Sequence, residues 1–235
     1  MNKELKLISV VMSVYNSEKT VSQAIDSILN QTYSNIELLI MDDCSDDQTY
    51  KILKTYEKKY MFIKVFRNDK NIGLTKSLNL LIKKTKGSFI ARQDGDDVSY
   101  KDRFEKQLDF IEKYNLDACT TRSKTFPLDE LRPKFSYYLP LRILIYYKNP
   151  FIHGSLMIKR EIIINLGLYD ERFYYSQDYK LMKDLINNNY KIKIMKEILY
   201  LLNTEDNIST QFSKKQKYYS KCVQKNIIPN NIENF

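Results

Sequence analysis

Acidic side chains gather at one point of the sequence, directly after a short apolar run. Residues 88–92 read SFIAR, a β-prone run, and the carboxylates that follow are Asp94, Asp96 and Asp97. Burying so many acids after a strand is unfavourable unless a cation or a hydroxyl-rich ligand answers their charge. Gly95 permits a tight turn that lets Asp94 and Asp96 point into one cavity. Such oxygen ligands suit Mg²⁺ or Mn²⁺, which take further ligands from water and substrate phosphates. The sequence therefore predicts a divalent metal site, with an exposed acidic loop or a helix N-cap as the alternative.

A second acidic loop follows an earlier run of apolar residues. The stretch 36–41 predicts a strand and leads directly into Asp42 and Asp43. In an open sheet of βαβ units the ligand binds beyond the carboxyl ends of the strands, so both acidic loops are expected at one edge. One carboxylate there could accept a hydrogen bond from a nucleobase N–H and thereby select the base. Capping of the next helix is a compatible role, which Ser45 could also fill.

Three further side chains have roles that their residue types leave open. Asp178 stands at the expected start of a helix, where the helix dipole keeps a carboxylate ionised as a proton acceptor, and where N-capping is the ordinary role. Tyr15 follows the first strand and could stack on a base, although packing is the usual role in a chain with 19 tyrosines. His153 is the only histidine, and without cysteine or histidine partners it does not predict a zinc site.

Strands and helices alternate in the part of the chain that must position the acidic loops. Apolar, β-branched runs predict strands at 5–14, 36–41, 62–66 and 88–92, and apolar residues at helical spacing predict helices at 18–30, 48–59, 71–84 and 101–114. Right-handed crossovers between such strands make residues 1–97 a mostly parallel, doubly wound, nucleotide-binding half.

The remainder of the chain is less regular. Three prolines among polar and aromatic residues predict a long loop or mobile flap over residues 121–140. Beyond it the patterns predict a short helix at 141–148, a broken strand at 151–158, helices at 159–166 and 176–189, and strands at 191–195 and 198–202. The Lys-rich stretch from 204 has no clear pattern.

Composition limits the class of protein. The 235 residues suit one α/β domain, and the formal net charge of +9 suits nucleic acid, an anionic membrane surface or a phosphorylated substrate. The three cysteines, at 44, 119 and 222, lie far apart without CxxC spacing, which indicates free thiols in a reducing compartment. The first apolar run is too short to span a membrane. We therefore expect a cytoplasmic protein, with peripheral contact at the inner face of the cell membrane as an option.

The order of four stretches resembles the glycosyltransferases of family 2, which have the GT-A fold. The stretches are ISVVMSVYNSEKTVSQAIDSILNQTYSNIELLIMDDCSDDQT, NIGLTKSLN, GSFIARQDGDDVSYKDRFEKQ and HGSLMIKREIIINLGLYDERFYYSQDYKL. The resemblance covers most of residues 7–190 and implies an α/β fold of GT-A type, with a doubly wound, mostly parallel or mixed sheet flanked by helices. It implies an inverting, metal-dependent transfer of a sugar from a nucleotide diphosphate sugar, UDP-linked above all, to an acceptor hydroxyl. Bacterial surface-glycan assembly, on a glycan or lipid-linked glycan acceptor, is the usual setting.

The resemblance implies a role for each matched position. Asp178 matches the general base, and Asp96, with Asp94, matches the ligands of Mn²⁺ or Mg²⁺. On the nucleotide-sugar side the expected residues are Ser13, Tyr15, Asp42, Asp43, Lys76, Arg92 and Asp94. His153 and Gln177 are expected on the acceptor side. The single catalytic domain would then comprise a nucleotide-sugar-binding half, 1–97, an acceptor-binding half, 98–203, and a Lys-rich tail, 204–235.

Two positions depart from the family pattern. Ser13 replaces the usual proline, where the backbone makes the contact. Gln177 replaces the usual glutamate before the base, which removes a charge beside Asp178 and bears on acceptor preference. The chain also ends soon after the expected domain without transmembrane helices, so a processive polysaccharide synthase is not expected.

Three other functions stay open. Transfer to a polyprenyl phosphate needs no base, because that acceptor is already an anion, and would be insensitive to loss of Asp178. A basic nucleic-acid-binding protein would bind with a steep salt dependence, although the acidic edge would repel a phosphate backbone. A nucleotidyltransferase shares the sheet and the metal but carries a glycine-rich basic loop after the first strand, where this chain has YNSEKT.

Overall fold

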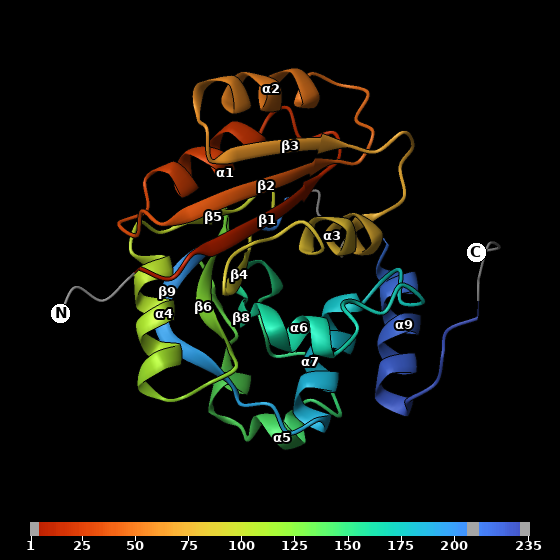
Figure 1. Ribbon diagram of the computed structural model, residues 1–235. Coiled ribbons are helices and arrows are strands. Elements are labelled where there is room, and N and C mark those ends of the chain that lie inside the picture. Colours follow the sequence, from red (N-terminus) through yellow and green to blue (C-terminus); the bar gives the residue numbers. More distant parts are fainter. Residues whose placement is uncertain (1–4, 206–211, 231–235) are drawn as a thin grey trace.

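One mixed sheet of nine strands runs through the computed structural model, which describes residues 5–205 and 212–230 (Figure 1). The strands follow the order β3 (Ile63–Arg67), β2 (Ile36–Asp42), β1 (Ile8–Val14), β4 (Phe89–Arg92), β8 (Met157–Lys159), β6 (Ala118–Phe126), β9 (Ile192–Asn203) and β5 (Val98–Ser99), and β7 (Leu131–Arg132) pairs with β6. The sheet continues from the first half of the chain into the second. The predicted division of the domain after residue 97 therefore stays a proposal.

The first four strands are parallel, as predicted from the sequence. β1 pairs with β2 and β4, and β2 pairs with β3. Helices α1 (Val21–Leu29), α2 (Thr49–Lys59) and α3 (Leu74–Ile82) connect them. Because Val14 is in register with Asp42, and Asp42 with Arg67, the carboxyl ends of these strands lie at one edge. The loops after β1, β2 and β4 are thereby brought together.

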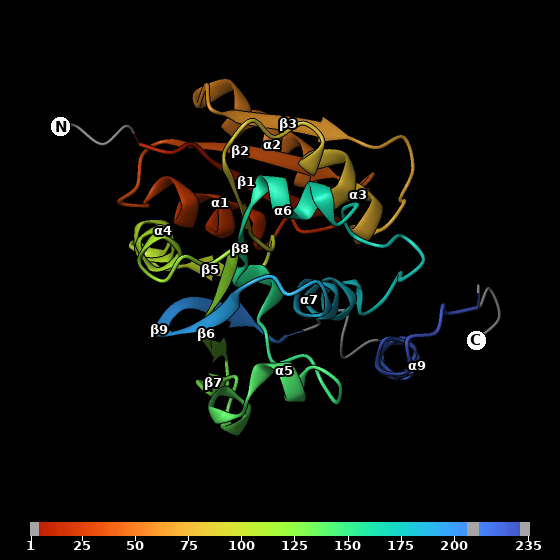
Figure 2. The same cartoon turned by 60° about the horizontal axis from the view of Figure 1, so that its bottom comes forward.

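Alternate side chains of the strands supply two hydrophobic cores, one on each face of the sheet. Val10 and Met12 of β1 pack with α1, α2 and α4 (Arg103–Lys113). Val11 packs on the other face with α3, α6 (Arg160–Asn165), α7 (Gln177–Asn187) and α9 (Ser213–Lys225). Figures 1 and 2 show these helices on both sides of the sheet. Burial on both faces explains why the β1 sequence is an unbroken apolar run.

The predicted loop or flap over 121–140 is wrong in its first part. β6 occupies residues 118–126 and pairs in parallel with β9 along its length. Its side chains are largely polar, yet Thr120, Thr121 and Ser123 are fully buried. Threonine is β-branched and fits a pleated sheet, but it adds nothing to a hydrophobic pattern. The rest of the stretch contains β7 and the 3₁₀ helix η1 (Phe135–Tyr138), and α5 (Leu141–Leu144) follows.

The C-terminal part also differs from its predicted pattern. β9 is one long strand where two short ones are expected, with register shifts opposite Arg122 that bend the pairing. The 3₁₀ helix η2 (His153–Ser155) replaces the first half of the expected strand at 151–158. The Lys-rich stretch contains α9, and its residues 206–211 and 231–235 lie outside the described part. Within the described residues, every helix is too short or too polar to span a bilayer.

Candidate active site

The acidic turn after β4 lies against the end of β1. Gly95 packs so closely on Val14 that a Cβ at position 95 would clash with the valine side chain. Position 95 needs glycine because of this close approach. It does not need glycine for its backbone conformation, which lies outside the left-handed region. The turn thereby places Asp94 and Asp96, both half-buried, at the carboxyl edge of the sheet.

Asp94 is held from three sides. The guanidinium of Arg92, which is 1% exposed, donates from Nη2 to Asp94 Oδ1 at 2.5 Å. The Asp94 backbone N–H donates to the hydroxyl of Tyr200 at 3.1 Å. Gly154 lies so near that a Cβ there would meet both Asp94 Oδ2 and the Tyr200 hydroxyl. Arg92, expected on the nucleotide-sugar side, is thus a buried partner of Asp94.

The neighbouring carboxyls are electrostatically strained. Burial and the charge of Asp94 raise the pKa of Asp96 to about 6. Burial and both neighbouring carboxylates also raise the pKa of Asp97 well above its ordinary value, although Asp97 Oδ1 accepts the Asn203 N–H at 2.7 Å. Removing charge or adding a cation are the two ways to relieve such repulsion.

Asp94 and Asp96 fit a divalent cation that prefers oxygen. Their carboxylates are adjacent, partly accessible and raised in energy by mutual repulsion. Within residues 5–205 and 212–230 there is no cluster of three His, Cys, Asp or Glu side chains that could enclose a metal. The protein would therefore supply a minority of the metal ligands. Water and the phosphates of a bound substrate would supply the others, which is the usual arrangement for Mg²⁺.

Asp178 lies at the first turn of α7 as a half-buried carboxylate. Asn149 donates from Nδ2 to Asp178 Oδ2 at 2.7 Å. Burial is the largest influence and raises the pKa of Asp178; the charge of Asp94 raises it further, while the Tyr179 N–H and Asn149 lower it. Asp178 thus shares an electrostatic environment with Asp94. A carboxylate with a raised pKa is a stronger proton acceptor than an exposed one.

The backbone before Asp178 is held by the C-terminal helix. Ser176 caps α7 in the left-handed conformation, with φ of 58°. Its hydroxyl lies 2.9 Å from Ser220 Oγ and donates to Gln216 Oε1 at 3.0 Å, and both partners belong to α9. Gln177, expected on the acceptor side, is buried beside Asp178.

His153 and Tyr169 form a neutral polar pair near Arg92 and Asp94. His153 Nε2 lies 2.7 Å from the Tyr169 hydroxyl. Burial and the positive charge of Arg92 lower the pKa of His153 to about 3, so its imidazole is neutral at physiological pH. Burial raises the pKa of Tyr169, and Arg92 opposes that shift. This pair places a polar but uncharged contact beside the acidic turn.

Asp42 and Asp43, at the end of β2, are buried and already have hydrogen-bond or ion-pair partners. Arg67 Nε lies 3.0 Å from Asp42 Oδ2 in an ion pair. Asp43 Oδ1 accepts hydrogen bonds from Asn68 Nδ2 and the Ile72 N–H, and Oδ2 accepts the Gly73 N–H at 2.8 Å. Asp43 therefore anchors the loop that precedes α3, and a second lone pair on Oδ2 remains for a ligand donor.

The structure brings some predicted residues together and leaves others apart. Asp94, Asp96, Asp178, His153 and Arg92 belong to one electrostatically coupled group. Ser13 and Tyr15 flank the end of β1, and Tyr15 is 45% exposed, accessible for stacking. Lys76 is exposed on α3, and in the described part of the chain no hydrogen bond or ion pair joins it to the acidic group. Its role on the nucleotide-sugar side stays a prediction.

Sequence reasoning missed four residues of this site, namely Asn149, Gly154, Tyr169 and Tyr200. Asn149 stands in a stretch without periodicity, and the tyrosines are lost among many others. The position of Gly154 next to the only histidine is the one local signal that could have pointed to the site.

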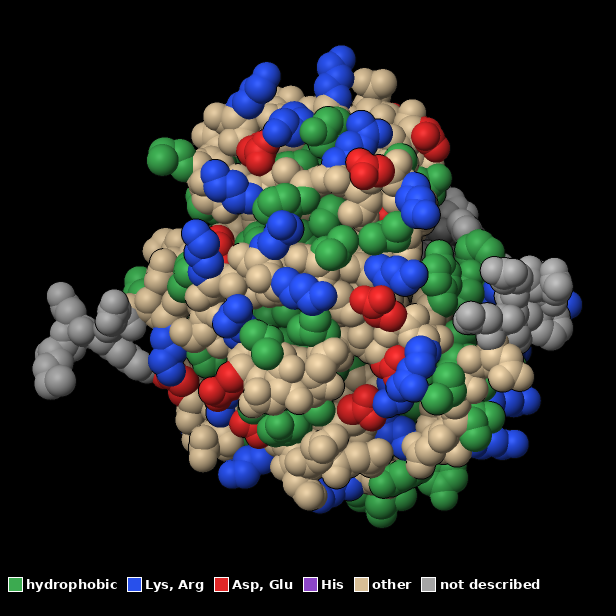
Figure 3. All heavy atoms as spheres, turned by 45° about the vertical axis from the view of Figure 1, so that its right-hand side comes forward, with side chains coloured by type: hydrophobic (Ala, Val, Ile, Leu, Met, Phe, Trp, Pro, Cys, Tyr) green, Lys and Arg blue, Asp and Glu red, His purple; other side chains and the backbone are tan. Residues whose placement is uncertain are grey.

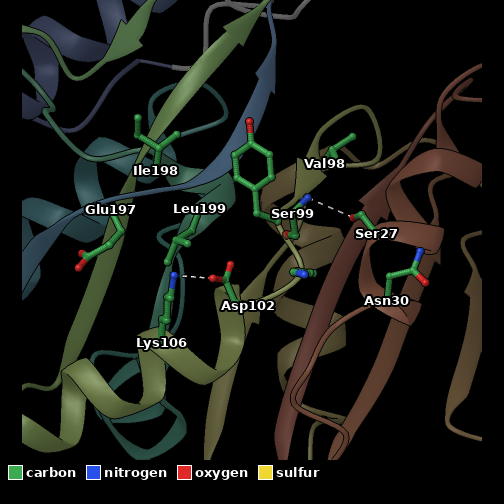
Figure 4. Close-up of a pocket in the computed structure, with 11 residues that line it drawn as sticks. Ser27, Asn30, Val98, Ser99, Asp102, Lys106, Glu197, Ile198 and Leu199 are labelled. Atoms are coloured by element: carbon green, nitrogen blue, oxygen red, sulfur yellow. Dashed lines mark hydrogen bonds and ion pairs between the residues drawn. The ribbon is translucent and has the colours of Figure 1, made fainter.

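A cavity of about 730 Å³ lies outside this group, between α1, β5, α4 and β9 (Figure 4). It is lined by Ser27, Asn30, Val98, Ser99, Tyr100, Lys101, Asp102, Lys106, Glu197, Ile198 and Leu199. None of the predicted site residues borders it. Several lining groups already have partners, since Ser99 donates its N–H to Ser27 Oγ and Lys106 pairs with Asp102. The acidic group is therefore the better candidate for chemistry.

Comparisons with known proteins show what this chain is similar to. The model of the family described as glycosyl transferase family 2 matches residues 9–167. The O-antigen biosynthesis glycosyltransferase WbnJ of Escherichia coli is 35% identical over 78% of this chain and 73% of its own.

Two solved structures share the fold. S. aureus TarS 1-349 in complex with UDP-GlcNAc has a TM-score of 0.74 at 22% identity, over 87% of this chain and 60% of that one. The mannosyltransferase PcManGT from Pyrobaculum calidifontis, in complex with GDP-Man and Mn²⁺, has a TM-score of 0.74 at 16% identity, over 90% of this chain and 61% of that one. This chain thus spans less than two thirds of either solved neighbour.

The expected GT-A fold is confirmed by these structural neighbours. The family match extends over more than half of the chain and contains the acidic turn, and WbnJ is 35% identical over 78% of this chain. The chain therefore belongs to glycosyl transferase family 2 and is a glycosyltransferase.

Proposed function

We propose that this enzyme transfers a sugar from a UDP-sugar to an acceptor hydroxyl, with inversion, in the assembly of a bacterial surface glycan. The name of WbnJ refers to O-antigen biosynthesis, which supports the setting. TarS was solved with UDP-GlcNAc and PcManGT with GDP-Man, which supports a nucleotide diphosphate sugar as the donor.

The observation that carries the proposal is the coupling of Asp178 to the acidic turn. Asp178 has a raised pKa and is oriented by Asn149. The negative charge of Asp94 contributes to that raised pKa. In the proposed reaction Asp178 takes the proton of the acceptor hydroxyl as its oxygen attacks the anomeric carbon. The bond from that carbon to the diphosphate oxygen breaks on the opposite face, which inverts the configuration.

The donor would lie across the carboxyl edge of the sheet. Asp94 and Asp96 would hold Mn²⁺ or Mg²⁺, which when bound offsets the negative charge of the departing diphosphate. Tyr15 would stack on the base, Ser13 would contact the nucleoside through its backbone, and the free lone pair of Asp43 would accept a base N–H. Lys76 would approach the phosphates from α3.

The proposal is tested by UDP release from a panel of UDP-sugars with Mn²⁺, with water or an added glycan as acceptor. Asp178→Asn keeps the size of the side chain but removes the base, so we expect kcat to fall by about 10² to 10⁴ while donor KM changes little. Asp184→Asn, on the same helix and paired with Lys180, is the matched control and should retain activity. Wild-type rates in Asp178→Asn would remove the assigned base and favour an anionic acceptor such as polyprenyl phosphate.

A further inference from the structure

Large apolar side chains are exposed on the segment between the end of β6 and Asn149, the residue that donates to Asp178. Phe135 is 86% exposed, Tyr138 74% and Tyr147 71%. The other large exposed members between residues 126 and 147 are Phe126, Leu128, Leu139, Ile143 and Tyr146. An exposed cluster of this size on a folded domain marks an interaction site more often than chance.

A stripe of lysines lies on the neighbouring helix α9. Lys214, Lys217, Lys221 and Lys225 recur at helical spacing and are all exposed, whereas Tyr219, Cys222 and Val223 of the same helix are buried. Residues 213–225 contain no acidic side chain, so nothing within the helix neutralises the stripe.

The exposed apolar residues and the lysine stripe adjoin each other; together they are called the aromatic–basic face. Gln224 of α9 donates from Nε2 to the Tyr147 carbonyl oxygen at 2.5 Å, which joins α9 to the segment after α5. Figure 2 shows α5 at the bottom of the molecule and α9 to its right, with α7 above and between them. In Figure 3, hydrophobic side chains with Lys and Arg side chains among them occupy the lower edge of the molecule.

The composition of the aromatic–basic face favours one occupant. Protein interfaces are enriched in tyrosine and phenylalanine but depleted in lysine, so the lysine stripe argues against a protein partner. Aromatic rings that insert at the headgroup level, beside lysines that meet anionic headgroups, are the pattern of an interfacial membrane surface. We propose that the aromatic–basic face docks on the surface of an anionic lipid bilayer.

The position of the face gives this docking a consequence for the site. The segment that carries the exposed rings is anchored beside the base, because the Tyr179 hydroxyl donates to the Ile145 carbonyl at 2.7 Å and Asn149 binds Asp178. The exposed Tyr147 is thus only two residues before Asn149, which contacts Asp178. This inference goes beyond the proposed function. Because vesicle binding is measured without a sugar donor, membrane docking and sugar transfer can each fail without the other.

The experiment is co-sedimentation of the full chain with vesicles. One set contains phosphatidylcholine alone, and the other contains phosphatidylcholine mixed with phosphatidylglycerol. We expect binding to the mixed vesicles that weakens as salt rises, and at least about tenfold weaker binding to the neutral ones.

Two groups of variants separate the parts of the face. Phe135→Ser with Tyr138→Ser removes exposed rings, and we expect at least about tenfold weaker binding at every salt concentration. The quadruple Lys→Gln change at Lys214, Lys217, Lys221 and Lys225 should lower binding by about tenfold or more and flatten the salt dependence. The matched controls are Met61→Ser, at 92% exposed, and Lys→Gln at Lys51, Lys58, Lys59 and Lys64, which are exposed on α2 and β3. Circular dichroism checks that each variant is folded.

Several outcomes would overturn the proposal. One is equal loss of binding in the α2 and β3 control, which would make the effect one of net charge alone. Another is a concentration-dependent dimer in sedimentation equilibrium that Phe135→Ser abolishes, because the face would then join two copies. A third is binding to single-stranded RNA but to neither vesicle, which would make nucleic acid the occupant.

Discussion

The hydrogen bond from Asn149 to Asp178 favours the ionised form of the residue proposed as the base. Burial raises the pKa of Asp178, and Asn149 opposes this by donating to the charged form. The ionised carboxylate is the competent state, so transfer falls as pH decreases through the raised pKa. The fall should therefore begin at a higher pH than for an exposed aspartate.

Removing the asparagine should move that acidic limb. In Asn149→Ala the charged form loses a donor, so the pKa of Asp178 rises further and the acidic limb of the kcat profile shifts to higher pH. The pH–rate profile of UDP release measures this shift. Asn165→Ala, exposed on α6, is the control and should keep the wild-type profile. Superimposable profiles for Asn149→Ala and wild type would contradict the assigned coupling.

The acids of the site could be predicted from sequence, whereas their partners could not. Asp94 and Asp96 stand out because charge after a buried strand is costly. Arg92 looks like a phosphate ligand in the sequence, yet it is buried against Asp94, because its contact depends on how the turn folds back. Tyr200 reaches Asp94 from a strand 106 residues later in the chain, and no local pattern contains such a contact.

At the scale of elements, the buried Lys183 joins α7 to α9. Its ammonium donates to the carbonyl oxygens of Val223 at 2.6 Å and Gln224 at 3.0 Å, near the C-terminal end of α9. The Val223 carbonyl also accepts the Asn226 N–H at 3.2 Å, and the positive charge of Lys183 favours that end of the helix dipole.

Replacing this lysine should cost stability. Lys183→Met keeps most of the apolar stem but removes the charged donor that both carbonyls share, so the free energy of unfolding should fall by about 1 to 3 kcal/mol. Urea unfolding followed by circular dichroism measures the change. Lys180→Met removes a half-exposed ion pair with Asp184 on the same helix and should cost less than about 1 kcal/mol. Equal losses in the two variants would show that the carbonyl contacts of Lys183 contribute no more to stability than the Lys180–Asp184 ion pair.

Elements with a strong hydrophobic period were predictable, and polar ones were not. The strands and helices of the first half appear close to their predicted bounds, because both faces of the parallel strands are buried in apolar cores. β6 buries threonine and serine side chains between β8 and β9, so its pattern resembles that of a loop. α9 has a lysine-rich surface and a narrow apolar stripe, which hid it in a polar tail.

At the scale of the whole molecule, a donor would bridge loops that follow β1, β2 and β4. Binding to the folded state alone stabilises it, by about 2.7 kcal/mol at a ligand concentration one hundred times Kd. UDP with Mn²⁺ should therefore raise the Tm by roughly 5 to 10 °C at that concentration.

The carboxylates of the acidic turn should govern this shift. Asp96→Asn should lose most of the extra stabilisation by UDP with Mn²⁺, because it removes one of the two proposed ligands of the cation. Asp129→Asn, a change at an exposed surface pair, should keep it. Differential scanning fluorimetry measures both. A wild-type shift in Asp96→Asn would place the cation elsewhere.

The hydrogen bonds between Ser176 and α9 also affect where this chain can be truncated without loss of function. The family model ends at residue 167, ahead of both Asp178, the proposed base, and the helix whose hydroxyl and amide groups hold the turn before it. Protein expressed to that boundary would retain the acidic turn and still lack the residue that we propose as the proton acceptor.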